Sequence, residues 1–263
     1  MKQSVISLVS PAGGTGKSTL SKELSCYFGA RRKDGIPLRV CLLDGDLHFG
    51  CQRALLRVPF TQKDLGTFLS DVRSDPEAFL APKSADARWD QMSKYFERID
   101  EYGIYLMTAP EKCVPEAEMT AEEAGILIGI LKDLFDIVVI DTPSGLSGLT
   151  KASLSLSRHL FFVMADDQRS LAKMLMLRRS LLKEGDLPSV EKRASVILNR
   201  CPGDKRRLYL DPSDVEEILR FPVSCMIPDF PDTLYYNNRF RSLSLSDTPF
   251  SAPVRKLSEM FTA

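Results

Sequence analysis

The sequence predicts a doubly wound α/β fold, in which a mostly parallel β-sheet carries helices on both faces. Short apolar runs alternate along the chain with segments of helical periodicity. The apolar runs lack strict alternation with polar residues, which is typical of strands buried on both faces of a parallel sheet. A chain of 263 residues, 44 % of them hydrophobic, is long enough to bury the core that such a sheet requires.

Seven apolar runs are predicted to be the strands, and they span 5–9, 38–44, 103–109, 136–141, 160–165, 194–199 and 222–227. Helical periodicity predicts helices over 17–32, roughly 116–135 and roughly 169–183. In the third helix we expect Leu171, Leu175 and Leu182 on the core side. The spacing of Ser213 and Glu216 is that of a capping box, which predicts one more helix start.

The whole chain, 1–263, is predicted to form one domain, because we find no internal repeat, low-complexity tract or linker in it. The secondary-structure pattern is weakest in residues 51–100. We interpret this segment as a helical excursion between the second and third strands. Near the C-terminus Val254, Leu257 and Phe261 share one helical stripe. We expect this stripe to pack onto the domain; the alternative is a short membrane-binding helix.

Composition restricts location and partners. Thirty-five basic residues balance 35 acidic ones, so no net charge steers the molecule toward nucleic acid or an acidic membrane. The six cysteines form no C-x-x-C pair, which favours buried, reduced thiols in a cytoplasmic protein. No run approaches the roughly 20 apolar residues of a membrane span, so membrane contact is at most peripheral. Lys and Arg do dominate 169–207, which leaves a basic, DNA-binding face as an alternative.

The stretch SPAGGTGKST, residues 10–19, predicts a phosphate-binding loop, although Pro11 stands where G-x-x-x-x-G-K-[ST] expects its first glycine. Proline supplies the negative φ that this position can use. Glycines let successive N–H groups turn toward an anion, and a helix start adds its own free N–H groups. The residues expected to bind the nucleotide are Gly13, Gly14, Thr15, Gly16, Lys17, Ser18 and Thr19. The alternative is a glycine-rich turn that binds nothing.

Carboxylates follow two of the predicted strands. Asp44 and Asp46 end the second strand at a spacing of two, so both are expected to address one Mg²⁺–water cluster. Asp141 follows four apolar residues in the Walker B arrangement and is expected to hold Mg²⁺, directly or through water, together with the Ser18 hydroxyl. The loop 142–145 is then placed to sense the γ-phosphate. The alternative for Asp44 and Asp46 is a polar turn after the strand, and the alternative for Asp141 is a helix N-cap.

The stretches AGGTGKST and LLDGDLHFG resemble the deviant Walker A class of ATPases, the ParA/MinD-like group of chromosome-partitioning and septum-site-determining proteins. This resemblance implies a SIMIBI-like P-loop NTPase fold, with ATP and Mg²⁺ as cofactors and a nucleotide-sandwich homodimer. Members carry a lysine immediately before the glycine pair, and that lysine reaches the partner's phosphates. Ala12 occupies the position here. The departure puts stabilisation in trans in doubt, but not the contacts of Lys17 in cis.

The resemblance also implies roles for single residues. Asp46 would position the attacking water, and Asp44 would belong to the outer shell of the metal, with Lys17 stabilising charge. Asn199 and Pro228, which close two later strands, would bracket the adenine. For Asn199 a simple turn role remains the alternative.

Within that family, the D-x-D-L-x-F-G turn and the A-P-x-x-x-x-P-E-A-E segment (109–118) look like the TadZ/CpaE branch, which positions tight-adherence pilus machinery. Members often carry a receiver-like domain in front, and this sequence starts directly at the P-loop strand. The branch implies a localisation factor, recruited to a cell pole or the inner membrane face, with protein partners in a pilus or secretion apparatus. His48 and His159 are isolated, so we expect packing or surface roles for them.

Two interpretations remain open. In the first, the chain is a dimerising ATPase switch with weak intrinsic hydrolysis, reset slowly after it recruits partners. In the second, it is a scaffold that keeps ATP as a structural ligand, since bound ATP stabilises a fold without turnover. The missing lysine favours the second interpretation, and the retained Lys17, Asp44, Asp46 and Asp141 favour the first. DNA partitioning and septum positioning are further alternatives.

Overall fold

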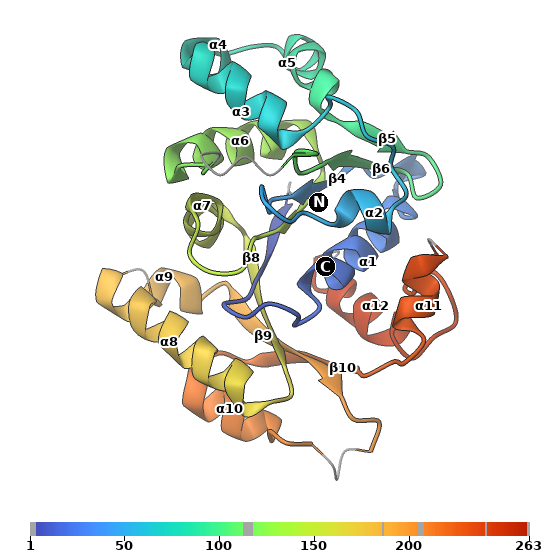
Figure 1. Cartoon of the computed structure of the whole chain (residues 1–263), viewed down its shortest axis with the longest axis vertical. Helices are drawn as coiled ribbons and strands as arrows, with labels where there is room; N and C mark the ends of the chain where they lie inside the picture. Colours follow the sequence, from blue (N-terminus) through green and yellow to red (C-terminus); the bar gives the residue numbers. More distant parts are fainter. Residues whose placement is uncertain (1–3, 113–117, 186, 205–207, 240, 262–263) are drawn as a thin grey trace.

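The structure, a computed structural model, describes residues 4–112, 118–185, 187–204, 208–239 and 241–261. Within those residues an eight-stranded sheet has the order β10-β9-β8-β1-β7-β4-β6-β5 (Figure 1). All neighbouring strands are parallel except β5 and β6. This confirms the predicted doubly wound, mostly parallel sheet. The strands are β1 (Ser4–Val9), β4 (Val40–Asp44), β5 (Glu97–Ile99), β6 (Ile104–Met107), β7 (Ile137–Asp141), β8 (His159–Ala165), β9 (Ala194–Cys201) and β10 (Val223–Pro228).

All seven predicted strands are present, with ends within two residues of the prediction. The strand that the sequence did not reveal is β5, a three-residue antiparallel edge strand with an exposed arginine at its centre. The sequence also did not predict a hairpin after α1 (Lys17–Gly29), which ends earlier than predicted. There β2 (Arg32–Lys33) and β3 (Ile36–Pro37) form a hairpin. Its two turn residues, Asp34 and Gly35, have φ values of 51° and 81°, as a tight hairpin turn requires.

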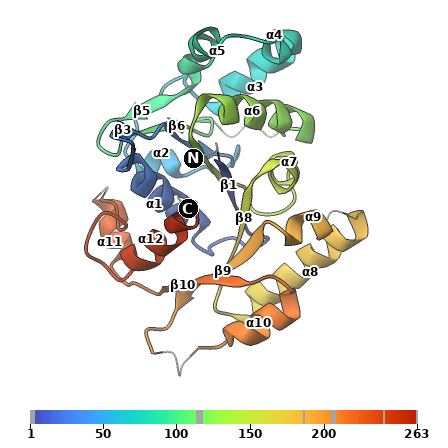
Figure 2. The same cartoon turned by 180° about the vertical axis from the view of Figure 1, so that it is seen from behind.

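Helices cover both faces of the sheet (Figures 1 and 2). Side chains of the strands alternate between the two layers. Ile6 of β1 and Leu42 of β4 face the layer of α1 and α12, whereas Val5 and Cys41 face the layer of α3 and α6. The remaining apolar cluster joins α8 and α10 to β8 and β9. The helices outside the segment 51–100 are α1, α6 (Ala121–Leu134), α7 (Gly148–Leu156), α8 (Gln168–Glu184), α9 (Leu187–Glu191), α10 (Pro212–Leu219), α11 (Thr233–Asn238) and α12 (Ser251–Glu259).

The segment 51–100 consists mainly of short helices that pack on the β4–β6 side of the sheet. Phe68 lies 5.4 Å, centroid to centroid, from both Phe79 and Tyr95, so aromatic contacts join its parts. Its elements are α2 (Gln52–Leu55), α3 (Leu65–Ser74), α4 (Pro76–Leu80), α5 (Ala85–Met92), the 3₁₀ helix η1 (Ser93–Tyr95) and β5.

Two helix details differ from prediction. In α8, Leu171 is buried and Leu175 is partly buried as expected, but Leu182 is 60 % exposed and Leu181 takes the core position. The expected stripe was therefore wrong at its last turn, where two adjacent leucines left the phase ambiguous.

The capping box expected at Ser213 and Glu216 was also wrong. Asp211 is the N-cap of α10 and accepts the Ser213 N–H at 2.8 Å, because Pro212 occupies the first helical position. The Glu216 carboxylate instead accepts the N–H of Val223. The helix expected over 116–135 begins at Ala121, where Thr120 and Glu123 form a true capping box; residues 116–117 lie outside the described residues.

The C-terminal helix packs onto the domain, as expected. Val254, Leu257 and Phe261 are all buried, and the ring of Phe261 lies 5.9 Å from that of Phe28 in α1. In the part of the chain that the structure describes, no helix is both long and apolar enough to cross a membrane.

His159, the first residue of β8, supports this packing as a neutral aromatic ring. Its imidazole lies edge-on to Phe261, with ring centroids 4.5 Å apart. Burial, together with the adjacent charge of Arg158, lowers the pKa of His159 to about 4. The packing role expected for this histidine is confirmed.

The same pKa shift predicts a pH-dependent stability. Between pH 6.5 and 4 the unfolded chain binds a proton at His159 that the folded chain excludes, so stability falls as pH falls. From pH 7 to pH 5, the wild type should lose about 1–2 kcal/mol of unfolding free energy more than His159→Gln. Urea unfolding followed by circular dichroism at both pH values measures this difference. Equal losses in the two proteins would contradict the shift.

A buried ion pair in α1 fixes the segment after α11. Lys22 Nζ lies 2.8 Å from Glu23 Oε1, and both side chains are at most 2 % exposed. Lys22 also donates to Asn237 Oδ1 at 2.8 Å. Glu23 Oε2 accepts the Ser242 hydroxyl at 2.6 Å and the Ser244 N–H at 2.8 Å. Adjacent charges inside an amphipathic helix are therefore tolerated because other chain segments complete their hydrogen bonds.

Removing one member of this pair should leave the other charge buried and unpaired. Glu23→Ala is expected to lower the free energy of unfolding by about 3–5 kcal/mol. Glu217→Ala, at an exposed position of α10, is the matched control and should change it by less than about 0.5 kcal/mol. Urea denaturation measures both, and similar small values for the two variants would show that the pair contributes nothing.

Candidate functional site

The glycine-rich loop joins the C-terminal end of β1 to the start of α1. Gly14 and Gly16 have φ values of 75° and 92°, the left-handed region that glycine adopts without strain. Gly13 and Gly14 are exposed, and no atom lies within 4 Å of where a Cβ would stand on either. One face of the loop is therefore open to a ligand, with the first turn of α1 behind it.

The front of the loop is folded inward. The Ser10 hydroxyl accepts the N–H of Ala12 at 3.2 Å and donates to the Ala12 carbonyl at 3.0 Å. Ala12 is 6 % exposed as a result. No cation projects from this position, and its methyl group packs against the protein.

Lys17 and Ser18 begin α1 and lie beside Asp141. Lys17 is largely buried, and Ser18 and Thr19 are partly buried. Burial raises the pKa of Asp141, while Gln52, the charge of Lys17 and the Ser18 hydroxyl partly offset that effect. The structure thus brings the predicted metal-binding pair, Ser18 and Asp141, to one place.

Asp44 and Asp141 end adjacent strands and are partners in the parallel register of β4 and β7. Both are buried, with exposed fractions of 1 % and 4 %. Burial, together with the charge of Asp141, raises the pKa of Asp44 to about 8. Two carboxylates this close cannot both ionise easily without a cation between or beside them.

One oxygen of each of these two carboxylates has no hydrogen-bond partner among the described residues. Among the described residues, Asp44 Oδ1 and Asp141 Oδ1 are buried and have no hydrogen-bond partner. Hard oxygen donors of this kind suit Mg²⁺, which keeps several waters and takes its other ligands from phosphates. The described residues contain no group of three or more His, Cys, Asp or Glu side chains that could hold a metal alone. The donor set therefore fits Mg²⁺ bound together with a nucleotide.

Asp46 lies in the turn just after this pair, where its backbone hydrogen bond and its charge both act on the pKa of Asp44. The strand β4 ends at Asp44, so Asp46 belongs to the following turn, where its Oδ1 accepts the N–H groups of His48 and Phe49 at 3.2 and 3.0 Å. With Ser144 it lines a cavity of about 610 Å³. Asp46 therefore faces the loop after β7.

That loop, 142–145, is tied to the strand before the P-loop. Thr142 donates its hydroxyl to the Leu8 carbonyl at 2.7 Å, and the Gly145 N–H reaches the Ser10 carbonyl at 3.4 Å. A change at the front of the P-loop would therefore reach this loop through the backbone.

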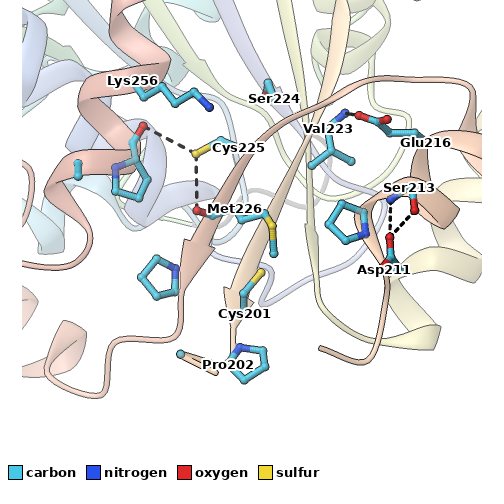
Figure 3. Close-up of a pocket in the computed structure, with 15 residues that line it drawn as sticks. Cys201, Pro202, Asp211, Ser213, Glu216, Val223, Ser224, Cys225, Met226 and Lys256 are labelled. Atoms are coloured by element: carbon cyan, nitrogen blue, oxygen red, sulfur yellow. Dashed lines mark hydrogen bonds between the residues drawn. The ribbon is translucent and has the colours of Figure 1, made fainter. Parts of the chain in front are cut away.

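The predicted base-binding residues lie near the C-terminal ends of the neighbouring strands β9 and β10. The Asn199 amide donates to the Thr15 carbonyl at 2.7 Å, so it is attached to the P-loop itself. Pro228 ends β10 and contributes to a cavity of about 840 Å³ between α10 and α12. Figure 3 shows that cavity, with Cys201 and Met226 at its centre.

The basic segment 169–207 does not present all its charges to solvent. Arg178 pairs with Glu191 at 3.4 Å. Arg193 donates to the carbonyls of Leu154 and Ser157. Residues 205–207 lie outside the described residues, as do 113–117 of the A-P-x-x-x-x-P-E-A-E segment.

Sequence reasoning missed Gln52, the first residue of α2. This side chain is fully buried between the P-loop helix and the two carboxylates. A single glutamine in a segment of weak periodicity gives no sequence signal. The one available hint is its position eight residues after Asp44.

No family model matches this chain. Among curated proteins, an ATP-binding protein of Methanocaldococcus jannaschii is 24 % identical over 225 residues, which cover 86 % of this chain and 74 % of that protein. A protein of Emiliania huxleyi described as a septum site-determining MinD is 21 % identical over 245 residues, covering 92 % and 80 %.

Solved structures resemble the fold over nearly its whole length. A ParA family ATPase from Chlorobium tepidum gives a TM-score of 0.78 at 20 % identity, covering 98 % of both chains. The cell division ATPase MinD from Pyrococcus furiosus gives 0.75 at 22 %, covering 100 % and 99 %. The septum site-determining protein MinD from Pyrococcus horikoshii, complexed with Mg-ADP, gives 0.71 at 20 %, covering 98 % and 96 %. The chain therefore has the fold of the ParA and MinD ATPases.

Proposed function

We propose that this chain binds Mg·ATP and works as a dimerising, ParA/MinD-like switch with weak intrinsic hydrolysis. The observation that carries the proposal is the convergence of an open glycine loop, Lys17 and the unpartnered oxygens of Asp44 and Asp141 at one sheet edge. Phosphates and a hard cation are the ligands that satisfy all of these groups at once.

Each residue has a task in this proposal. The N–H groups of residues 13–19 bind phosphate oxygens, and Lys17 adds a positive charge near the transferred phosphoryl. Ser18 and Asp141 hold Mg²⁺, Asp141 directly or through water, and Asp44 belongs to its outer shell. When bound, the metal neutralises charge on the phosphates. Asp46, facing the loop 142–145, orients the attacking water. Asn199 and Pro228 contact the base.

Buried Ala12 supports slow hydrolysis. An interfacial cation at a phosphoryl-transfer site contributes on the order of 10³ to 10⁵ in rate. Here that position carries Ala12, a residue without charge that is 6 % exposed. The same observation favours the second candidate, a scaffold in which ATP is retained and not hydrolysed.

An exposed apolar surface beside the P-loop supports dimerisation with a second copy of the chain. Leu146 and Met176 are 38 % and 66 % exposed, and with Pro11 and Gly145 they border an apolar cavity of about 390 Å³. A homodimer would cover these side chains and place the two nucleotides near the interface.

The finer role we propose is that of a localisation or assembly factor for a pilus or secretion apparatus, acting in the cytoplasm or recruited to a pole or the inner membrane face. It is supported by the D-x-D-L-x-F-G turn and by the missing lysine. DNA partitioning and septum positioning, the roles in the names of several structural neighbours, are the alternatives. The internal contacts of Arg178 and Arg193 disfavour a continuous DNA-binding face.

Lys17→Ala tests nucleotide binding. Loss of a charge-assisted contact should weaken Mg·ADP binding about 10-fold to 100-fold. Isothermal titration calorimetry measures the affinity, with Lys132→Ala, an exposed lysine on α6, as the matched control. If wild type binds no nucleotide, or Lys17→Ala binds as well as the control, the proposed site is wrong.

Ala12→Lys separates the switch from the scaffold. If the missing lysine limits turnover, restoring it should raise steady-state ATP hydrolysis at least about 10-fold, with little change in Mg·ADP affinity. Phosphate release measures the rate, and Ala12→Met controls for the larger side chain at a buried position. Tight ATP binding with no turnover in wild type or Ala12→Lys would reject the switch in favour of the scaffold.

A further inference from the structure

Gln52 contacts both buried carboxylates through separate donors. Its backbone N–H donates to Asp44 Oδ2 at 2.8 Å. Its side-chain Nε2 donates to Asp141 Oδ2 at 2.9 Å. The same Nε2 lies 2.8 Å from the Ser18 carbonyl and 3.1 Å from Ser21 Oγ. One residue thus joins the ends of β4 and β7 to the P-loop helix.

This arrangement selects which oxygens remain available. Asp44 and Asp141 each have Oδ2 bound by Gln52 and Oδ1 without a hydrogen-bond partner among the described residues. Gln52 Oε1 is also buried and unpartnered there. Buried acceptors without partners are uncommon and costly, so the two unpartnered carboxylate oxygens beside Gln52 point to a bound group that satisfies them.

The neighbouring residue holds Gln52 in place. Arg53 is buried and donates to Thr108 Oγ1 at 2.5 Å and to the Pro59 carbonyl. Its guanidinium also lies 5.3 Å from the ring centroid of Phe60. The short helix α2 is therefore attached both to Thr108, at the end of β6, and to residues 59–60, which follow α2 itself. A carboxamide on such a support is preorganised.

We propose that Gln52 is a positioning residue for magnesium: it fixes one oxygen of Asp44 and one of Asp141, so that the remaining oxygens face the metal and its waters. This inference rests on the proposed function, because it requires Mg·nucleotide at this site. Gln52 touches neither nucleotide nor reacting atoms in this role, and it acts through the two carboxylates. Outer partners of this kind typically contribute 10-fold to 100-fold to metal affinity.

Gln52→Met tests the role, because methionine keeps the length and volume of the side chain and removes its amide. The readout is the Mg²⁺ concentration that gives half of the Mg²⁺-dependent gain in binding of fluorescent ADP. ADP affinity in EDTA is measured beside it. We expect Gln52→Met to require about 10-fold more Mg²⁺, with ADP affinity in EDTA unchanged within about 2-fold. Gln52→Leu replaces it if Gln52→Met does not fold.

Gln91→Met is the matched control, since Gln91 is a hydrogen-bonded, partly buried glutamine on α5 whose amide contacts Ala78 and Arg88. It should leave the Mg²⁺ requirement unchanged. A purely structural role for Gln52 would weaken ADP binding equally with Mg²⁺ and with EDTA, and this result would overturn the inference. So would a Mg²⁺ requirement equal to that of wild type.

The two possible failures are distinguishable. If wild type binds no ADP, or Mg²⁺ adds nothing to its ADP binding, then the proposed function fails and the inference fails with it. If wild type shows the Mg²⁺-dependent gain and Gln52→Met shows the same gain at the same Mg²⁺ concentration, the proposed function stands and the role of Gln52 is rejected.

Discussion

The parallel register of three adjacent strands is the constraint on which the rest of the site depends. Asp141 of β7 is the register partner of Leu8 in β1 and of Asp44 in β4. The loop that begins after β1 and the carboxylates that end β4 and β7 must therefore meet at one sheet edge. Because a strand has a period of two, a slip of one residue would turn the carboxylates toward the other face. The strands β1, β4 and β7 are buried along their whole length, so such a slip would also disturb the packing of core side chains on both faces.

This constraint carries a cost in the absence of ligand. It places two carboxylates in a buried position, where desolvation raises the pKa of both and takes that of Asp44 to about 8. Gln52 offsets part of the cost with two hydrogen bonds, and Lys17 offsets part with its charge. The unpartnered oxygens that remain are satisfied by a cation, so ligand binding and stability of the folded chain should be linked.

The parts of the molecule that follow from local pattern were predictable. Fully apolar strands, glycines before a helix and acids after strands are each specified within about ten residues, and the register then brings them together. The parts that depend on distant contacts were not. The ion pair of Lys22 and Glu23 is completed by residues near 240, and Gln52 is recognisable as a site residue because of Asp141, 89 positions later. Leu181 and Leu182 are adjacent, and local periodicity does not show which of the two is buried. Tertiary packing buries Leu181 and leaves Leu182 exposed.

The front of the P-loop is held by hydrogen bonds within the chain rather than by a charged side chain. In the homodimer that we propose, a lysine at position 12 would offer a cation to the second subunit. The Ser10 hydroxyl instead bonds the backbone of Ala12, and the Ser10 carbonyl accepts the Gly145 N–H. The loop after β7 is thereby linked to the start of the P-loop by a backbone hydrogen bond within one chain. In the homodimer that we propose, a nucleotide-dependent change would therefore have to reach the second subunit through this internal link and through the exposed apolar side chains of Leu146 and Met176, because position 12 carries no charge.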